Sequence, residues 1–202
     1  MTKIKLCGIS RSEDIAIVNH LKPEYIGFVF AKKSKRYVSS NKAADLKKEL
    51  CDGIKTVGVF VNEPIENIAE LFRKNVIDVA QIHGNENEDY IDNLKKLVDI
   101  PVIKAFQMNK VTDISAVEYS KADYILLDSG AGSGETFDWE SVKHIKRPFF
   151  LAGGLNEHNV AAAVKDIHPF AVDVSSGIET NGVKDGIKMA DFVAAVRKED
   201  RL

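Results

Sequence analysis

The chain has 202 residues, 45% of them hydrophobic and 29% charged, a balance typical of an ordinary folded domain with one substantial core. Its 28 basic and 30 acidic residues give a formal net charge of −2, so the overall charge gives no reason to expect nucleic acid or an anionic membrane as a partner. No apolar run approaches the roughly 20 residues of a membrane span, and no signal-peptide core precedes the first strand pattern. We therefore expect a cytoplasmic protein that forms one domain over residues 1–202.

Short apolar runs with the composition of β-strands recur along the whole chain. They predict strands at Lys3 to Ile9, Tyr25 to Phe30, Lys55 to Val61, Val79 to His83, Val102 to Phe106, Tyr124 to Asp128, Phe149 to Gly153 and Ala171 to Val174. The runs are apolar on both faces, as expected for a parallel sheet that is covered on both sides.

Helical patterns lie between these runs, most of them behind a recognisable capping residue. The caps that we expect are a box formed by Ser10 and Glu13, the pair Ser39 and Ser40, Asn62 ahead of Pro64, and Asn156. Apolar stripes run from Ile15 to Leu21, Ala43 to Leu50, Ile65 to Phe72 and Tyr90 to Leu97, and later helices are expected at Asp113 to Tyr119, Trp139 to Ile145, Asn156 to Lys165 and Lys184 to Arg197.

This alternation predicts an α/β fold, specifically a single (β/α)8 TIM barrel in which a parallel sheet closes on itself inside a ring of helices. An open, doubly wound sheet is the alternative. Eight equivalent units without a long insertion favour closure. In such a barrel the active site lies at the C-terminal ends of the strands, so the polar residues at those ends are the functional candidates.

The ends of strands 7 and 8 carry small residues that can donate hydrogen bonds. Gly153 and Gly154 follow one strand, where the absence of a Cβ lets backbone N–H groups approach a ligand, and Ser175, Ser176 and Gly177 follow the other. Either segment alone could be an ordinary glycine turn. Together at one end of a barrel, they predict a phosphate-binding site.

Five further side chains stand at or near the strand ends. Cys7 could be an inert buried thiol or a reactive one, and His83 could be structural or a ligand contact. Asp128 closes an apolar strand, where a carboxylate needs partners or a raised pKa, and this favours a functional role. Arg36 belongs to a basic run that could be solvated surface, but its planar guanidinium suits a carboxylate. Asp173, in the last strand, completes the set.

The glycine-rich loop Gly130 to Gly134 lacks the spacing of a dinucleotide fingerprint. We expect it to be a mobile loop over the active site, anchored by Phe137 and Trp139. No group of His and carboxylate residues has the spacing of a metal site, so no metal is expected. Cys7 and Cys51 should lie at opposite ends of the sheet, too far apart for a disulfide, and remain free thiols.

Seven motifs in chain order resemble the phosphoribosylanthranilate isomerase family. They are Ile-Lys-Leu-Cys7-Gly-Ile, Ser-Lys-Arg36-Tyr-Val-Ser, Val-Gly-Val-Phe60-Val-Asn, Gln-Ile-His83-Gly, Leu-Leu-Asp128-Ser with Gly-Glu-Thr-Phe-Asp-Trp139, Leu-Ala-Gly-Gly154-Leu, and Val-Asp173-Val-Ser-Ser-Gly-Ile-Glu179. The resemblance covers essentially the whole chain. Glu135 is a departure, because relatives often carry lysine there.

The resemblance implies an isomerase of tryptophan biosynthesis that converts N-(5-phosphoribosyl)anthranilate to 1-(2-carboxyphenylamino)-1-deoxyribulose 5-phosphate by an Amadori rearrangement. It implies Asp128 as the general acid that opens the sugar ring and Cys7 as the general base that removes the C2 proton. The implied substrate-binding residues are Arg36, His83, Gly153, Gly154, Asp173, Ser175, Ser176 and Gly177. No cofactor or metal is implied, and the partner is a phosphorylated small molecule bound by a monomer or homodimer. For work near neutral pH, we expect the site to lower the pKa of Cys7 and to raise that of Asp128.

Two alternatives remain at this point. A related histidine-pathway isomerase would be expected to carry an aspartate at the end of the first strand, where this chain has Cys7. A non-catalytic barrel that only binds a phosphorylated ligand would give no turnover.

Overall fold

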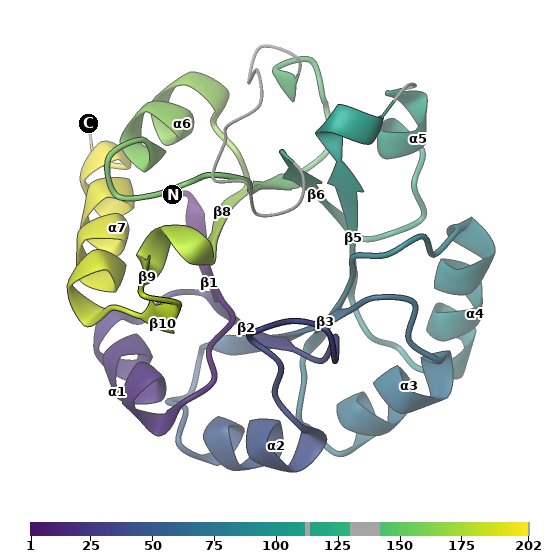
Figure 1. Cartoon of the computed structure of the whole chain (residues 1–202). Helices are drawn as coiled ribbons and strands as arrows, with labels where there is room; N and C mark the ends of the chain where they lie inside the picture. The colour runs from purple at the N-terminus through teal and green to yellow at the C-terminus, as the bar shows by residue number, and fades with distance from the viewer. Residues whose placement is uncertain (112–113, 130–141, 202) are drawn as a thin grey trace.

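The computed structural model describes residues 1–111, 114–129 and 142–201, and its centre is a ring of eight parallel strands (Figure 1). The strands are β1 (Lys3–Cys7), β2 (Tyr25–Val29), β3 (Lys55–Phe60), β4 (Val79–Ile82), β5 (Val102–Gln107), β6 (Tyr124–Asp128), β7 (Phe149–Leu151) and β8 (Ala171–Val174). They pair in chain order, and β8 closes back on β1 with Lys3 opposite Ala171 and Leu6 opposite Val174. The predicted barrel is confirmed, and the open sheet is wrong because β1 has a parallel neighbour on each side.

Helices surround the outside of the ring (Figure 1). They are α1 (Ser12–Leu21), α2 (Ser40–Lys48), α3 (Ile65–Arg73), α4 (Glu88–Leu97), α5 (Ser115–Glu118), α6 (Val160–Ile167) and α7 (Gly186–Glu199). Two 3-10 turns, η1 (Met108–Lys110) and η3 (Ser176–Ile178), and a small hairpin of β9 (Glu179–Thr180) and β10 (Val183–Lys184) complete the described elements. The helix expected at Asp113 to Tyr119 is the single turn α5. The loop Gly130 to Gly134, Glu135, Phe137 and Trp139 lie outside the described residues.

The strands β2, β3 and β4 end one residue earlier than the sequence predicted, and β1 and β7 end two residues earlier, where a glycine follows the strand. β1 stops at Cys7 because Gly8 has a φ of 82°, and β7 stops at Leu151, shortly before Gly153 with a φ of 85°. Such positive φ angles lie outside the extended region and are readily adopted only by glycine. The chain therefore turns away from the sheet at the rim where the functional candidates lie.

The capping box predicted for α1 is wrong by one residue. Asp14, not Glu13, accepts the backbone N–H groups of Ser10 and Arg11, both at 3.1 Å, and its other oxygen binds the Arg11 guanidinium. Asp14 is buried and Glu13 is exposed, so only Asp14 can make these bonds. The expected cap of α2 is confirmed, since the Ser39 hydroxyl accepts the Lys42 N–H at 3.3 Å.

The two asparagine caps are also wrong. The Asn62 side chain accepts the N–H of Asn85, in the loop after β4, at 2.9 Å and so links two loops, while α3 begins at Ile65. Asn156 accepts the N–H of His158 at 2.9 Å in a local turn, and α6 begins at Val160. Asparagine side chains bind nearby backbone groups as readily as helix ends, which explains both errors.

The core has two layers, one between the strands and helices and one inside the ring. The inner layer consists of Tyr25, Val57, Val79, Ile103, Ala105, Leu126, Phe150, Ala152 and Ala171. Because successive side chains of a strand point to opposite faces, Lys5 and Cys7 both belong to the inner face of β1. Cys7 packs against Val29 and Val59 just above this layer, and it forms part of the floor of the pocket described below.

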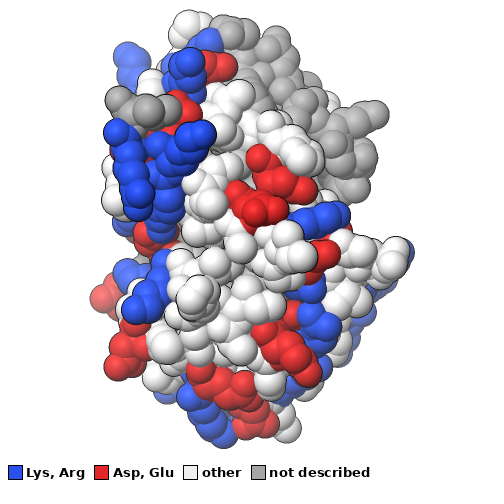
Figure 2. Space-filling view, turned by 90° about the vertical axis from the view of Figure 1, so that its left-hand side faces the viewer, with Lys and Arg blue, Asp and Glu red and all other residues white. Residues whose placement is uncertain are grey.

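The outer surface carries charges of both signs. Figure 2 shows the face over α7, where basic and acidic side chains occur together. Within residues 1–111, 114–129 and 142–201, none of the helices has the length and apolar character needed to cross a membrane.

Phe150 is the aromatic centre of the inner layer, with ring centroids 5.5 Å from Tyr25, 5.9 Å from Tyr124 and 5.6 Å from Phe170. We expect Phe150→Ala to lower the free energy of unfolding by about 3 to 5 kcal/mol, because it leaves a cavity inside the ring. Ile187→Ala, at a residue that is 75% exposed, is the control and should change the free energy of unfolding by less than about 0.5 kcal/mol. Urea titration of both variants measures the difference, and equal effects would contradict the packing role of Phe150.

Candidate active site

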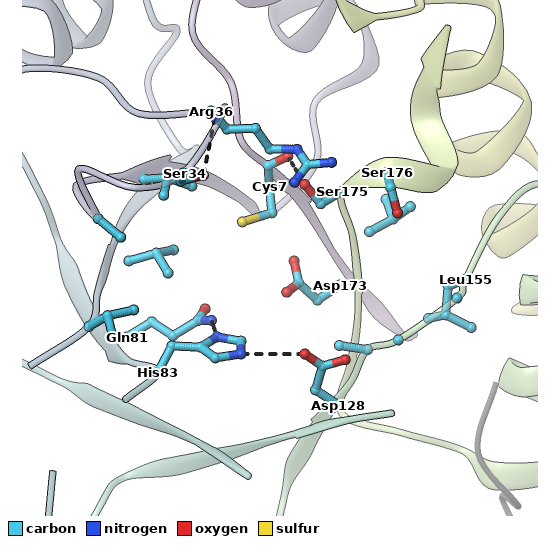
Figure 3. A pocket seen from close by; sticks show the side chains of 18 residues that line it. Cys7, Ser34, Arg36, Gln81, His83, Asp128, Leu155, Asp173, Ser175 and Ser176 are labelled. Carbon is cyan, nitrogen blue, oxygen red and sulfur yellow. Dashed lines mark hydrogen bonds and ion pairs between the residues drawn. The ribbon is translucent and has the colours of Figure 1, made fainter. Parts of the chain in front are cut away.

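One pocket opens at the carboxyl ends of the strands and brings together residues from widely separated parts of the chain (Figure 3). Of the predicted site residues, those that line it are Cys7, Arg36, His83, Asp128, Gly153, Gly154, Asp173, Ser175 and Ser176. Gly177 is the exception. In Figure 3, Cys7 and Asp128 lie on opposite sides of the pocket, with Asp173 between them.

Beneath the pocket lies a fully buried lysine that the sequence analysis did not single out. Lys5 has no exposed surface, and its Nζ lies 2.8 Å from Oδ1 of Asp173, across the seam between β1 and β8. Burial disfavours the Lys5 ammonium, but Asp173 and Cys7 outweigh this effect and raise the pKa of Lys5. A buried charge is tolerated only when it is paired, so the Asp173 carboxylate is needed to hold Lys5 in place.

Cys7 is buried beside this pair, and its environment does not lower its pKa as expected. Burial raises the pKa of the thiol, and the negative charge of Asp173 adds to the effect, while the cations Lys5 and Lys184 oppose it. The expectation is wrong because the sequence could not show how deeply the thiol is buried. Cys7 and Cys51 are both free, one buried and one exposed, as predicted.

Arg36 lies on the rim and is held by a carboxylate of the chain itself. Its Nε and Nη2 donate to the two oxygens of Glu179 at 2.6 and 2.8 Å, a bidentate pair. Lys184 binds the same carboxylate at 2.7 Å and the Ser175 carbonyl at 2.8 Å. Burial alone would raise the pKa of Glu179, but the hydrogen bonds from Arg36 and Lys184 outweigh it and hold the pKa at about 2. The hairpin β9–β10, which carries Glu179 and Lys184, therefore fixes the orientation of Arg36.

His83 and Asp128 meet at the other side of the pocket. His83 Nε2 lies 3.4 Å from Asp128 Oδ2, and the side-chain amide of Gln81 lies 3.0 Å from His83 Nδ1. The contact joins the loop after β4 to the end of β6. Gln81 was not identified from the sequence, although it stands two residues before His83.

The predicted phosphate cradle depends on very close contact between backbone segments. A Cβ on Gly177 would lie 2.0 Å from the Leu155 carbonyl oxygen, and one on Gly153 would lie 2.4 Å from the Ser129 backbone nitrogen. Gly177 thus supports the cradle from behind instead of lining the pocket. Gly153 and Gly154 both have positive φ angles, 85° and 67°, which glycine adopts without strain.

No group of three or more His, Cys, Asp or Glu residues within the described ranges has an arrangement that could hold a metal ion. The glycine-rich loop at 130–134 is outside those ranges, so its expected position over the pocket stays a prediction.

The barrel holds acid and base candidates in one pocket, a guanidinium on the rim and a glycine- and serine-lined end between β7 and β8. These features define a barrel enzyme of the phosphate-binding type. The sequence model of the N-(5'phosphoribosyl)anthranilate (PRA) isomerase family matches residues 4–195. The chain belongs to this family.

Individual relatives agree with this assignment. The N-(5'-phosphoribosyl)anthranilate isomerase of Endomicrobium trichonymphae is 47% identical over 202 residues, covering 98% of this chain and 99% of that protein. The enzyme of the same name from Clostridium acetobutylicum is 46% identical over 207 residues, covering 98% of this chain and 99% of that protein. Among solved structures, phosphoribosyl anthranilate isomerase from Thermus thermophilus superposes with a TM-score of 0.88 at 31% identity, covering 98% of this chain and 99% of that one. The structure of the isomerase from Thermotoga maritima superposes with a TM-score of 0.86 at 36% identity, covering 98% of this chain and 100% of that one.

The burial of Cys7 predicts an unusual reactivity profile. Only a thiolate reacts with iodoacetamide, so in a Cys51→Ser background the alkylation rate should rise with pH through a midpoint above that of a free thiol, about 8.5. Lys184→Met should move the midpoint higher still, because it removes a cation that favours the thiolate.

Mass spectrometry at a series of pH values measures this midpoint. The Cys51→Ser chain unfolded in urea is the matched control and should react like a free thiol. A midpoint at or below that of the unfolded chain would show that the folded site does not raise the pKa of Cys7.

Proposed function

We infer that this chain is an N-(5'-phosphoribosyl)anthranilate isomerase, which catalyses the Amadori rearrangement of its substrate to 1-(2-carboxyphenylamino)-1-deoxyribulose 5-phosphate in tryptophan biosynthesis. Family membership over residues 4–195 supports this inference. A structural relative with a TM-score of 0.85 and 35% identity, covering 98% of this chain and 100% of that one, is in complex with the reduced form of that product. The observation that carries the inference is the single pocket lined by Cys7 and Asp128 on opposite sides.

The reaction needs an acid and a base that act on different atoms of one substrate. In the proposed mechanism, Asp128 protonates the furanose ring oxygen, the C1–O bond breaks, and the sugar opens to a protonated Schiff base. Cys7 then removes the proton from C2, which leaves an enolamine that tautomerises to the ketone. The positive charge of the Schiff base lies next to C2, the carbon whose proton Cys7 removes. That charge favours the thiolate and offsets the raised pKa of the ligand-free site.

The two ends of the substrate carry anionic groups. We assign its carboxylate to Arg36 and its phosphate to the cradle formed by Gly153, Gly154, Ser175 and Ser176. The pair with Glu179 uses the Nε proton and one Nη2 proton of Arg36, and the other three N–H groups of a guanidinium are left for a ligand. Glu179 therefore does not compete with the substrate for the whole guanidinium.

Further properties of the protein follow from the same inference. We propose that residues 1–202 form one catalytic domain, which is active in the cytoplasm as a monomer or a homodimer. Its partner is the phosphorylated small-molecule substrate, and it binds neither nucleic acid nor a membrane. The solved relatives include monomers generated from the dimeric phosphoribosylanthranilate isomerase of Thermotoga maritima, so the barrel of that relative exists in both forms.

Substitution of the proposed acid and of the proposed base, one at a time, tests the mechanism. With N-(5'-phosphoribosyl)anthranilate as substrate, Asp128→Asn should lower kcat by about 10²- to 10⁴-fold, the usual contribution of a general acid. Cys7→Ser should lower it further, because a serine hydroxyl is almost never ionised. Cys51→Ser, at an exposed thiol, is the control and should keep wild-type activity. Full activity of either site variant would refute its assignment, and a wild type without turnover would favour the non-catalytic barrel.

Inorganic phosphate tests the cradle. Phosphate should compete with substrate, raising the apparent KM in proportion to its concentration and leaving kcat unchanged, because it occupies the site of the substrate phosphate. Steady-state kinetics at several phosphate concentrations measure this effect, and sodium chloride at the same ionic strength is the control. An apparent KM that responds equally to both salts would place the substrate phosphate elsewhere.

A further inference from the structure

Three side chains form a line of polar contacts along one wall of the pocket (Figure 3). Gln81 is the third residue of β4, His83 follows that strand, and Asp128 ends β6. The Gln81 amide nitrogen lies 3.0 Å from His83 Nδ1, and His83 Nε2 lies 3.4 Å from Asp128 Oδ2. His83 is thus held at both ring nitrogens by groups with different hydrogen-bonding capacities.

These partners determine where the protons of His83 lie. Oδ2 of Asp128 accepts a hydrogen bond in the carboxylate, and also in the acid when the proton is on Oδ1, so Nε2, which faces it, carries a proton. The Gln81 amide nitrogen only donates, so Nδ1, which faces it, presents a lone pair. The arrangement therefore fits the neutral imidazole with its proton on Nε2. A doubly protonated ring would place two donors against each other at Nδ1.

Gln81 is held in this orientation at an energetic cost. The side chain is only 1% exposed, between Val59 and Ile103 on the neighbouring strands, and its Oε1 is the buried side-chain polar atom without a hydrogen-bond partner in the described part of the chain. A buried oxygen without a hydrogen-bond partner destabilises the folded state, because it has lost its hydration without compensation. Turning the amide would leave its NH2 group, with two donors, unpaired in the same place. The cost is expected only where the amide has a task.

We propose that Gln81 is a positioning residue that keeps His83 neutral and so allows Asp128 to hold the proton that it delivers as general acid. The proposal rests on the proposed function, which gives Asp128 the role of acid. A cation beside a carboxyl group favours the ionised carboxylate, and a carboxylate has no proton to give. A neutral N–H donor fixes the position of Asp128 without adding that positive charge.

Other titratable groups line the hollows that His83 borders, while the group within hydrogen-bond distance of Nδ1 is the Gln81 amide. Cys7, Arg36 and Asp173 line the same pocket. Glu86, Lys104 and Lys110 line a hollow on the other side of the His83 loop, where Lys104 is paired with Glu86 at 3.2 Å. Gln81 is the group in direct contact with Nδ1, so it is the one to change.

The charge state of His83 can be measured directly in the ligand-free protein. Long-range 15N–1H correlation spectra at pH 7 should show Nδ1 unprotonated and Nε2 protonated in the wild type, with the His83 signals assigned by their loss in His83→Asn. In Gln81→Glu, the new carboxylate accepts from Nδ1, so both ring nitrogens should appear protonated. A wild-type His83 that is an imidazolium or carries its proton on Nδ1 would overturn the proposal, as would an unchanged His83 spectrum in Gln81→Glu.

The kinetic consequence separates this role from general support of the fold. At pH 7, Gln81→Glu should lower kcat by about 10-fold or more, equivalent to a shift of at least about one pKa unit in Asp128, with KM changed by less than a factor of about two. The deficit of Gln81→Glu relative to the wild type should shrink as the pH is lowered, because Asp128 then regains its proton while the protonation of Cys7 affects both proteins alike. A loss of kcat that is the same at every pH would point to structural damage and contradict the proposal.

Two further variants keep the test decisive. Asn41→Asp adds the same new charge on the exposed surface of α2, away from the residues that line the pocket, and should leave the His83 spectrum unchanged. If Gln81→Glu does not fold, Gln81→Met removes only the donor. A larger share of His83 should then be imidazolium at pH 6 than in the wild type, and an equal share would overturn the proposal. Failure of the acid assignment is distinguishable, because it would appear as an active Asp128→Asn whatever the state of His83.

Discussion

The ion pair between Lys5 and Asp173 is the interaction on which the site depends. It joins β1 to β8, the two strands whose pairing closes the barrel, and it lies directly beneath Cys7. An ammonium in this dry interior would be strongly unfavourable without the carboxylate, so the two residues act as one unit. The unit also sets the field at the thiol, where Lys5 favours the thiolate and Asp173 opposes it. Closure of the fold and the chemistry of the base thus involve the same two side chains.

The rest of the pocket repeats this pattern of charges that are each restrained by a partner. Arg36 and Lys184 share the carboxylate of Glu179, and His83 stands against Asp128. Side chains held in this way lose little conformational freedom when a ligand arrives, which reduces the cost of binding. The pocket is therefore largely organised before the substrate enters, and the short hairpin β9–β10 contributes as much to its order as the barrel strands.

The fold was predictable because its signals are repeated. Eight apolar runs and the helical patterns between them all predict the same barrel. An error at one helix end, such as the misplaced cap at Glu13, therefore did not change the predicted fold. The strand-end rule also located Cys7 and Asp128. Lys5 and Gln81 were missed, although each stands two residues before a recognised candidate and so shares its inward face. Glu179 and Lys184 could not be placed, because a separation of five positions does not show that the chain folds back as a hairpin. The raised pKa of Cys7 depends on burial, which the sequence pattern does not measure.

The contact between Gly177 and the Leu155 carbonyl has a consequence for how such a barrel can diversify. At that position even a methyl group would collide with the main chain, so the geometry of the cradle is a property of the backbone and cannot be adjusted by exchanging side chains there. The pocket floor and the opposite rim, by contrast, are built from side chains of β1, β4 and β6 and can vary without moving the backbone. Substitutions that alter the substrate or the reaction are therefore expected at the other end of the site, where they need no shift of the main chain.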